Sequence, residues 1–424
     1  MIRRRSLIIL VLALVVAIGI GWWTLFVYPY SPKRPPRADD TGFTKEGVQL
    51  VSNGNNLFSI DMYKKLSEAS SENVFYSPYS IFSAMAMTYE GANGETYDEI
   101  KKVFHFPDKE KLRPNFARIY NEINREVGDY ELRTGNALWV QKDFPLLEEY
   151  KTTVEKYYGG KAANLDFVNE TEKSRETINK FIEEQTNGKI KDLISKGILD
   201  RYTRLVITNA IYFKGTWKWE FKKSDTRDED FYVNPKETVK VPMMYMKPEK
   251  AEFNYAETEK LQILELPYKG DRISMIILLP KKESGYTLKD VEKELSYENL
   301  KKWLMKMQKT KLDAIYIPKF TFKTKYFLKD ALTKMGMKTS FSGNADFSKI
   351  TGKKDLFISN VIHQAFIDVN EKGTEAAAAT AIVMKLTAIK PTHIFRADHP
   401  FIFIIQDKET GSILFMGRLV NPAE

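Results

Sequence analysis

The sequence predicts an α+β fold around one large core, and three observations lead to this prediction. Apolar residues make up 43% of the 424 residues, a globular composition at a length that can bury a sizeable core. Helical patterns dominate the first part of the chain and strand-like runs the remainder, an order typical of α+β proteins. No second linker, repeat or low-complexity tract occurs from Thr44 to Glu424, which indicates a single domain at 44–424.

Three segments carry the helical pattern. Residues 47–69 and 171–194 have apolar side chains at helical spacing, and the second of these helices is expected to end at Gly188. Between them, Ser77 precedes Pro78, which sets a cap residue before a proline at the first helical position. The helix that follows, residues 79–92, is almost entirely apolar, so we expect it at the centre of the fold.

The strand-like runs are rich in β-branched, aromatic and aliphatic residues. They lie at residues 204–217, 261–280, 311–322, 365–369, 399–407 and 412–420. Because these runs follow the helical segments, we expect largely antiparallel strands in the second half of the domain.

The N-terminal segment 1–30 predicts a membrane anchor. Leu7 to Val27 form an uncharged run of 21 residues, long enough to cross a bilayer as a helix. The basic stretch Arg3–Arg5 favours an orientation with the rest of the chain outside the cytoplasm. A cleaved signal peptide is the alternative, and it would give a secreted protein. Residues 31–43 then form a Pro-rich linker to the domain.

Composition excludes several kinds of site. The chain has no cysteine, which excludes disulfides, a thiol nucleophile and cysteine-ligated metals. Its formal charge of +9 is spread over interspersed acidic and basic residues, which is not typical of nucleic-acid binding. Four histidines are present, without a hydrolase, zinc-protease or phosphate-loop motif. We therefore expect a monomer that is not an enzyme, with no catalytic residue, metal or cofactor.

Several motifs resemble those of the serpins, a family of serine protease inhibitors, and they follow the family's order from Thr44 to the C-terminus. They are residues 72–104, 135–144, 186–194, 205–221, 345–350, 356–380 and 395–422. The resemblance implies a large mixed or antiparallel central sheet, further sheets, about eight to nine helices and an exposed reactive centre loop.

The resemblance also assigns structural roles to individual residues. Ser77, Ser80, Asn209 and His363 match the polar cluster beneath the opening of the central sheet, which is called the shutter. Trp217 matches a tryptophan where the loop first enters the sheet; plain core packing accounts for it equally well. Asn169 begins a glycosylation sequon, Asn-Glu-Thr. The helices near Arg118 and Arg125 lack a dense basic face, so no polyanion site is expected.

The same resemblance implies that the loop is bait for a protease and inserts into the central sheet as a new strand. The hinge of this loop comprises Gly373, Thr374, Glu375, Ala376, Ala377, Ala378 and Ala379. Strand alternation would turn Thr374, Ala376, Ala378, Thr380, Ile382 and Met384 inward. None of these carries a charge, and Glu375 falls on the outward face, so burial of the strand imposes no charge penalty. An alanine-rich helix is the alternative for this segment.

The family's usual loop length, counted from Glu371, sets the reactive bond between Thr387 and Ala388, with Leu386–Thr387 as second choice. Small or apolar residues there suit an elastase-like, subtilisin-like or chymotrypsin-like serine protease, and a cysteine protease stays open as a partner. The alternative function is a serpin-fold protein that binds or supports other molecules without inhibition. The small, uncharged side chains on the inward face of the hinge favour inhibition.

Overall fold

The computed structural model describes residues 37–125, 130–249, 251–374 and 393–423. The predicted membrane segment 7–27, the hinge residues 375–379 and the reactive bond Thr387–Ala388 lie outside these ranges. Among the helices of the described ranges, none has both the length and the apolar character needed to cross a bilayer.

The described ranges contain ten α-helices. They are α2 (Lys45–Ala69), α3 (Pro78–Gly91), α4 (Gly94–Phe104), α5 (Lys109–Ile123), α6 (Glu148–Tyr158), α7 (Thr171–Gln185), α8 (Leu288–Glu294), α9 (Tyr297–Leu304), α10 (Lys329–Met335) and α11 (Ser348–Thr351). This number is close to the eight to nine helices that the resemblance implies, and it includes helices as short as α11, with 4 residues.

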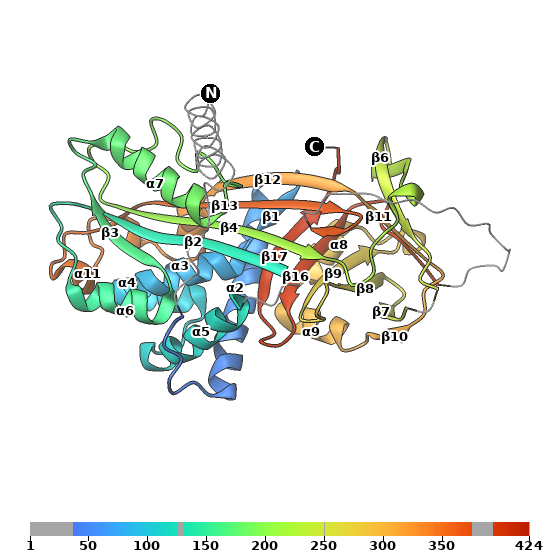
Figure 1. Ribbon diagram of the computed structural model, residues 1–424, viewed down its shortest axis with the longest axis horizontal. Coiled ribbons are helices and arrows are strands. Elements are labelled where there is room, and N and C mark those ends of the chain that lie inside the picture. Colours follow the sequence, from blue (N-terminus) through green and yellow to red (C-terminus); the bar gives the residue numbers. More distant parts are fainter. Residues whose placement is uncertain (1–36, 126–129, 250, 375–392, 424) are drawn as a thin grey trace, which may run out of the picture. The chain divides into compact units, whose positions relative to one another are not determined.

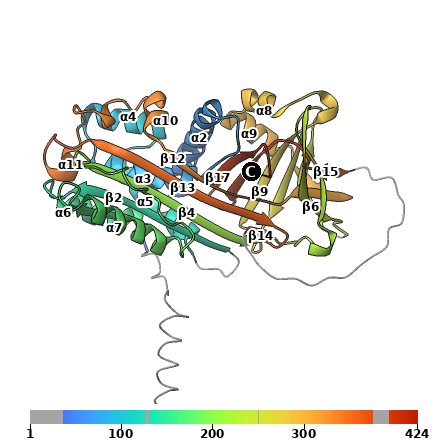
Figure 2. The ribbon, with the colours of Figure 1, turned by 90° about the horizontal axis from the view of Figure 1, so that it is seen from above.

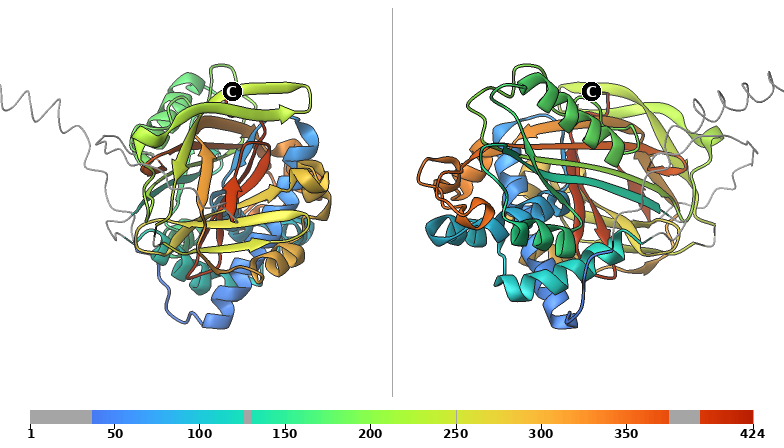
Figure 3. Two further views of the ribbon diagram at one scale, coloured as in Figure 1. Left: turned by 90° about the vertical axis from the view of Figure 1, so that its right-hand side faces the viewer. Right: turned by 60° about the vertical axis from the view of Figure 1, so that its left-hand side comes forward.

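The strands form three sheets in the part of the chain that the structure describes. The central sheet has the order β12 (Phe320–Phe327), β13 (Ile358–Asn370), β14 (Gly373–Thr374), β4 (Leu205–Thr216), β2 (Tyr130–Gln141) and β3 (Lys161–Leu165). A second sheet has the order β1 (Val74–Tyr76), β17 (Ile413–Leu419), β16 (Phe401–Asp407), β9 (Ile273–Pro280), β8 (Leu261–Pro267), β7 (Phe253–Glu257) and β10 (Gln308–Thr310). The third has the order β15 (Ile394–Arg396), β11 (Ala314–Pro318), β6 (Glu237–Met246) and β5 (Arg227–Asn234). Figure 3 (left) views the molecule from the end where β5 and β6 lie.

The α+β prediction and the predicted strands are confirmed. The central sheet is mixed, because β2 and β4 are antiparallel whereas β4 and β13 are parallel. Helix α3 packs against one face of this sheet, and α7 lies over the other face (Figure 1).

Helix α3 is as central as its apolar sequence predicts. The Ser77 hydroxyl caps it by accepting a hydrogen bond from the backbone N–H of Ser80, and Pro78 begins the helix. All residues from Pro78 to Gly91 are buried. A helix that is apolar all round needs neighbours on every side, and α3 therefore lies between the central sheet and the other helices.

The domain's contacts begin before Thr44. The backbone N–H of Ala38 donates to Oδ1 of Asn121 at 2.9 Å, and the N–H of Asp39 donates to the carbonyl oxygen of Lys156 at 2.7 Å. Residues 38 and 39, which the sequence assigned to the linker, are therefore attached to α5 and α6.

Candidate functional site

Strands β4 and β13 meet at a seam in the middle of the central sheet. They pair directly in parallel register, from Leu205 with Ile358 to Tyr212 with Phe366. Beyond that point the chain turns back, and β14 lies between the two strands, antiparallel to both. Figure 2 shows β14 beside the end of β13. The first two residues of the predicted hinge thus already part the sheet at this end.

Gly373 and Thr374 fit this narrow space for different reasons. Gly373 has φ of +152°, and a Cβ on it would lie 1.9 Å from the carbonyl oxygen of Gly215, so a side chain there would collide with β4. Thr374 points into the core, where it is 1% exposed. Its hydroxyl shares a 2.8 Å hydrogen bond with the hydroxyl of Tyr268.

Trp217 lies at the mouth of the seam, directly after β4. Its indole N–H donates to the carbonyl oxygen of Asn370 at 3.0 Å, and its backbone N–H donates to that of Lys372 at 2.7 Å. The ring stacks on Tyr268 with 4.4 Å between the centroids. Trp217 therefore holds the turn that directs the chain from β13 into β14.

The four residues of the predicted polar cluster meet beneath the seam, each no more than 1% exposed: Ser77, Ser80, Asn209 and His363. The backbone N–H of Ser77 donates to Nε2 of His363 at 3.0 Å, so this ring nitrogen carries no proton. The Nδ1–H of His363 therefore donates to Oδ1 of Asn209. Burial lowers the pKa of His363 to about 3, which keeps the ring neutral.

Asn209 connects the cluster to α3 and β2. Its Nδ2 donates to the carbonyl oxygen of Ser80 at 2.6 Å and to Oδ1 of Asn136 at 2.5 Å. The hydroxyl of Ser77 donates to the carbonyl oxygen of Leu414 at 2.6 Å. A neutral, hydrogen-bonded network thus joins α3 to β2, β4 and β13 at the seam.

Sequence reasoning missed two residues of this site. Asn136 of β2 lies directly opposite Asn209, just before the apolar run that begins at Ala137, and its position in the sequence gives no signal of this role. Tyr268 follows β8 in a turn, and only the tertiary fold brings it against Thr374 and Trp217.

The opposite face of the seam is covered by residues 186–204, which follow α7 and which we call the cover segment. Its residues Ile190, Leu193 and Ile194 are fully buried in one cluster with Val206 and Ala210 of β4 and Ile362 of β13. Asn179 of α7 holds the cover segment, because its Oδ1 accepts from the N–H of Ile194 at 2.8 Å and its Nδ2 donates to the carbonyl oxygen of Ile194 at 2.9 Å.

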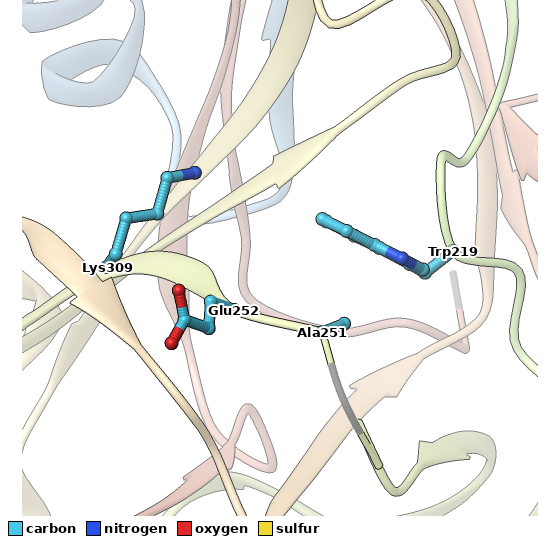
Figure 4. Close-up of a pocket in the computed structure, with 4 residues that line it drawn as sticks. All are labelled: Trp219, Ala251, Glu252 and Lys309. Atoms are coloured by element: carbon cyan, nitrogen blue, oxygen red, sulfur yellow. The ribbon is translucent and has the colours of Figure 1, made fainter.

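Two other features lie away from the seam. Asn169 is exposed just before α7, and its Nδ2 donates to Asp166 at 3.1 Å; its glycosylation stays a prediction. A shallow hollow of about 350 Å³ is lined by Trp219, Ala251, Glu252 and Lys309. Figure 4 shows Glu252 and Lys309 on one side of it and Trp219 on the other. Among the predicted site residues that the structure describes, none lines this hollow.

Comparison with known proteins agrees with the geometry of the seam. The family model described as serpin (serine protease inhibitor) matches residues 53–422. An uncharacterized serpin-like protein of Thermococcus kodakarensis is 45% identical over 386 residues, which cover 90% of this chain and 88% of that protein. Leukocyte elastase inhibitor of Homo sapiens is 39% identical over 380 residues, which cover 88% of this chain and 100% of that protein.

Among solved structures, Serpin48 from the insect Tenebrio molitor has a TM-score of 0.77 at 35% identity, over 88% of this chain and 98% of that one. The fold, with a mixed sheet in which β14 lies between two strands that are parallel to each other, defines the serpin class. The chain belongs to the serpin family.

Proposed function

We propose that this chain inhibits proteases by inserting its reactive loop as a new strand between β4 and β13, and that it is not an enzyme. The observation that carries the proposal is β14, which pairs with both strands at one end of the seam. The similarity to leukocyte elastase inhibitor supports a protease as the partner.

Two registers support insertion along the seam. Continuing the antiparallel pairing of β14 with β13 would bring Thr380 opposite His363. Continuing the pairing of β14 with β4 would bring Thr380 opposite Asn209. His363 and Asn209 are themselves paired across the seam, so one inserted strand would satisfy both registers. The hydroxyl of Thr380 would then supply a partner for polar atoms that the opening of the seam separates.

The energetics favour the inserted form. Insertion would remove the parallel pairing of β4 with β13 and would add an antiparallel pairing of the new strand with each of them. Each added hydrogen bond would stabilise the inserted form by about 1 kcal/mol. The uninserted form would therefore be kinetically trapped. Cleavage of the loop would release this constraint.

The inhibitory step follows from the timing of cleavage. The catalytic serine of the protease would attack the carbonyl carbon of Thr387, and the amine of Ala388 would leave with a proton. Insertion while the ester is intact would carry the protease along and distort its active site, so that water does not complete hydrolysis. Thr387 and Leu386 suit the substrate pockets of elastase-like, subtilisin-like or chymotrypsin-like proteases. A cysteine protease is the alternative partner.

The test is incubation of the full chain with a panel of these proteases, read on a denaturing gel. Inhibition predicts a covalent adduct and a released peptide that begins at Ala388. Cleavage without an adduct would contradict inhibition and favour the non-inhibitory alternative.

We further propose that Leu7–Val27 anchors the domain, as a monomer, on the outer side of a membrane, or is cleaved to release a secreted form. The uncharged run and the preceding arginines support this. N-terminal sequencing of protein from membrane and soluble fractions distinguishes the two forms, and protein found only inside the cytoplasm would contradict both.

A further inference from the structure

Lys325 of β12 connects one side of the seam to the cover segment. Its Nζ donates to the carbonyl oxygen of Asp192 at 3.2 Å and to the hydroxyl oxygen of Ser195 at 3.3 Å. Lys325 is paired with Gln364 of β13, so it belongs to the pair of strands on the β13 side of the seam.

The cover segment is attached to the other side. Asn179 of α7 holds Ile194 by two hydrogen bonds, and α7 itself packs on β2. The ring of Phe181 meets Trp139 edge-on at 5.3 Å, and a Cβ on Gly135 would lie 3.2 Å from Cδ1 of Ile182. The two bonds from Lys325 therefore bridge the seam from β12 to a segment that α7 fixes to β2.

Gln364, the residue paired with Lys325, has a buried side-chain oxygen that accepts no hydrogen bond from the described residues. Gln364 is 2% exposed, and its Oε1 has no hydrogen-bond donor among the described residues. A buried acceptor without a partner destabilises the arrangement that contains it. The seam thus contains an unfavourable buried group at the position where Lys325 bridges it.

We propose that Lys325 slows the opening of the seam and so sets the rate of loop insertion. This proposal rests on the proposed insertion mechanism. A strand added between β4 and β13 moves β12 away from β2 by about 4.8 Å. Bonds of 3.2 and 3.3 Å cannot survive this displacement while the cover segment stays on α7. Lys325 is a positioning residue, because it acts through the cover segment and not on the protease.

The test measures insertion without a protease. A synthetic peptide with the sequence of residues 374–386 is added to the full-length chain, and its entry is followed as a gain in thermal stability with time. Lys325→Met removes the two bonds and keeps the apolar stem, so it should accept the peptide about fivefold faster than the wild type. Lys325→Arg retains a donor and should restore a rate close to that of the wild type.

Two further variants complete the design. Lys323→Met removes an exposed charge from the same face of β12, two residues away, and should leave the rate unchanged. Ser195→Ala removes one partner of Lys325 and should accelerate entry about twofold. Equal rates for Lys325→Met and the wild type would overturn the proposal, as would equal acceleration by both methionine variants. If the peptide enters none of the proteins, the wild type included, loop insertion itself is wrong.

Discussion

His363 and Asn209 are hydrogen-bonded to each other across the seam between β13 and β4, so a strand that enters there must separate them. Both side chains are buried, and a buried polar atom that loses its partner costs about 1–3 kcal/mol. Insertion is therefore favourable only if the entering strand offers replacement partners at this row of the sheet.

Thr380 is the residue that we expect to offer them. Thr380→Val keeps the shape of the side chain and removes the hydroxyl, so it should destabilise the cleaved, inserted form by about 1–3 kcal/mol. The intact form should change little. Denaturant unfolding of intact and cleaved protein measures both effects. Thr380→Ser should restore the stability of the cleaved form, and a loss that is equal in both forms would contradict the register.

The low pKa of His363 predicts a dependence on pH. Between its pKa of about 3 in the fold and an ordinary value near 6.5 in the unfolded chain, the unfolded state binds the extra proton. Stability of the intact form should therefore fall as the pH is lowered through this window, by up to about 1.4 kcal/mol per pH unit from this group.

His363→Gln should lack this pH-dependent contribution to stability. The measurement compares the urea midpoints of the variant and the wild type at each pH from pH 7 to pH 4. His393→Gln, a change at an exposed histidine, should retain the wild-type slope. Parallel pH profiles for His363→Gln and the wild type would contradict the assignment of a neutral, buried ring.

Thr374 tests the hinge. Thr374→Arg would bury an unpaired charge against Tyr268, at a cost of about 3–5 kcal/mol, so the loop should fail to insert and the protein should become a substrate. The number of inhibitor molecules consumed per protease molecule trapped measures this, and we expect it to rise at least about tenfold. Thr238→Arg adds the same charge at an exposed position of β6 and should leave the ratio unchanged. Unchanged trapping by Thr374→Arg would contradict the role of the hinge.

Gly373 and Gly285 offer a matched pair of glycines. Both have positive φ, of +152° and +70°, but a Cβ meets the Gly215 carbonyl oxygen only at Gly373, whereas nothing lies within 4 Å of one at Gly285. Gly285→Ala should cost about 1 kcal/mol of stability and leave trapping unchanged. Gly373→Ala should displace β14 and weaken trapping of the protease. Equal effects of the two changes would show that the close approach to β4 does not matter.

Much of the fold could be predicted from local patterns in the sequence. The Ser77–Pro78 start of α3 and the long strand β4 have strong signals, because capping, apolar character and β-branched side chains act over a few neighbouring residues. The site residues Ser77, Ser80, Asn209 and His363 came from a resemblance to the family, and the structure brings them together beneath the seam.

Other contacts of the site depend on distant parts of the chain. Tyr268 reaches Thr374 over 106 residues of sequence, and Lys325 reaches the cover segment over 130 residues to Ser195. No local pattern marks a tyrosine in a turn or a lysine on an edge strand as part of a site. Such residues are recognisable only once the order of strands in the central sheet is known.

Thermal unfolding of the intact and the cleaved chain tests the central claim most directly. The chain is cut once, at the bond after Thr387, and both forms are heated under the same conditions. Loop insertion predicts that the cleaved form unfolds at a clearly higher temperature, because the seam has gained a strand with hydrogen bonds on both edges. A cleaved form that unfolds at the same temperature as the intact form, or at a lower one, would contradict the account.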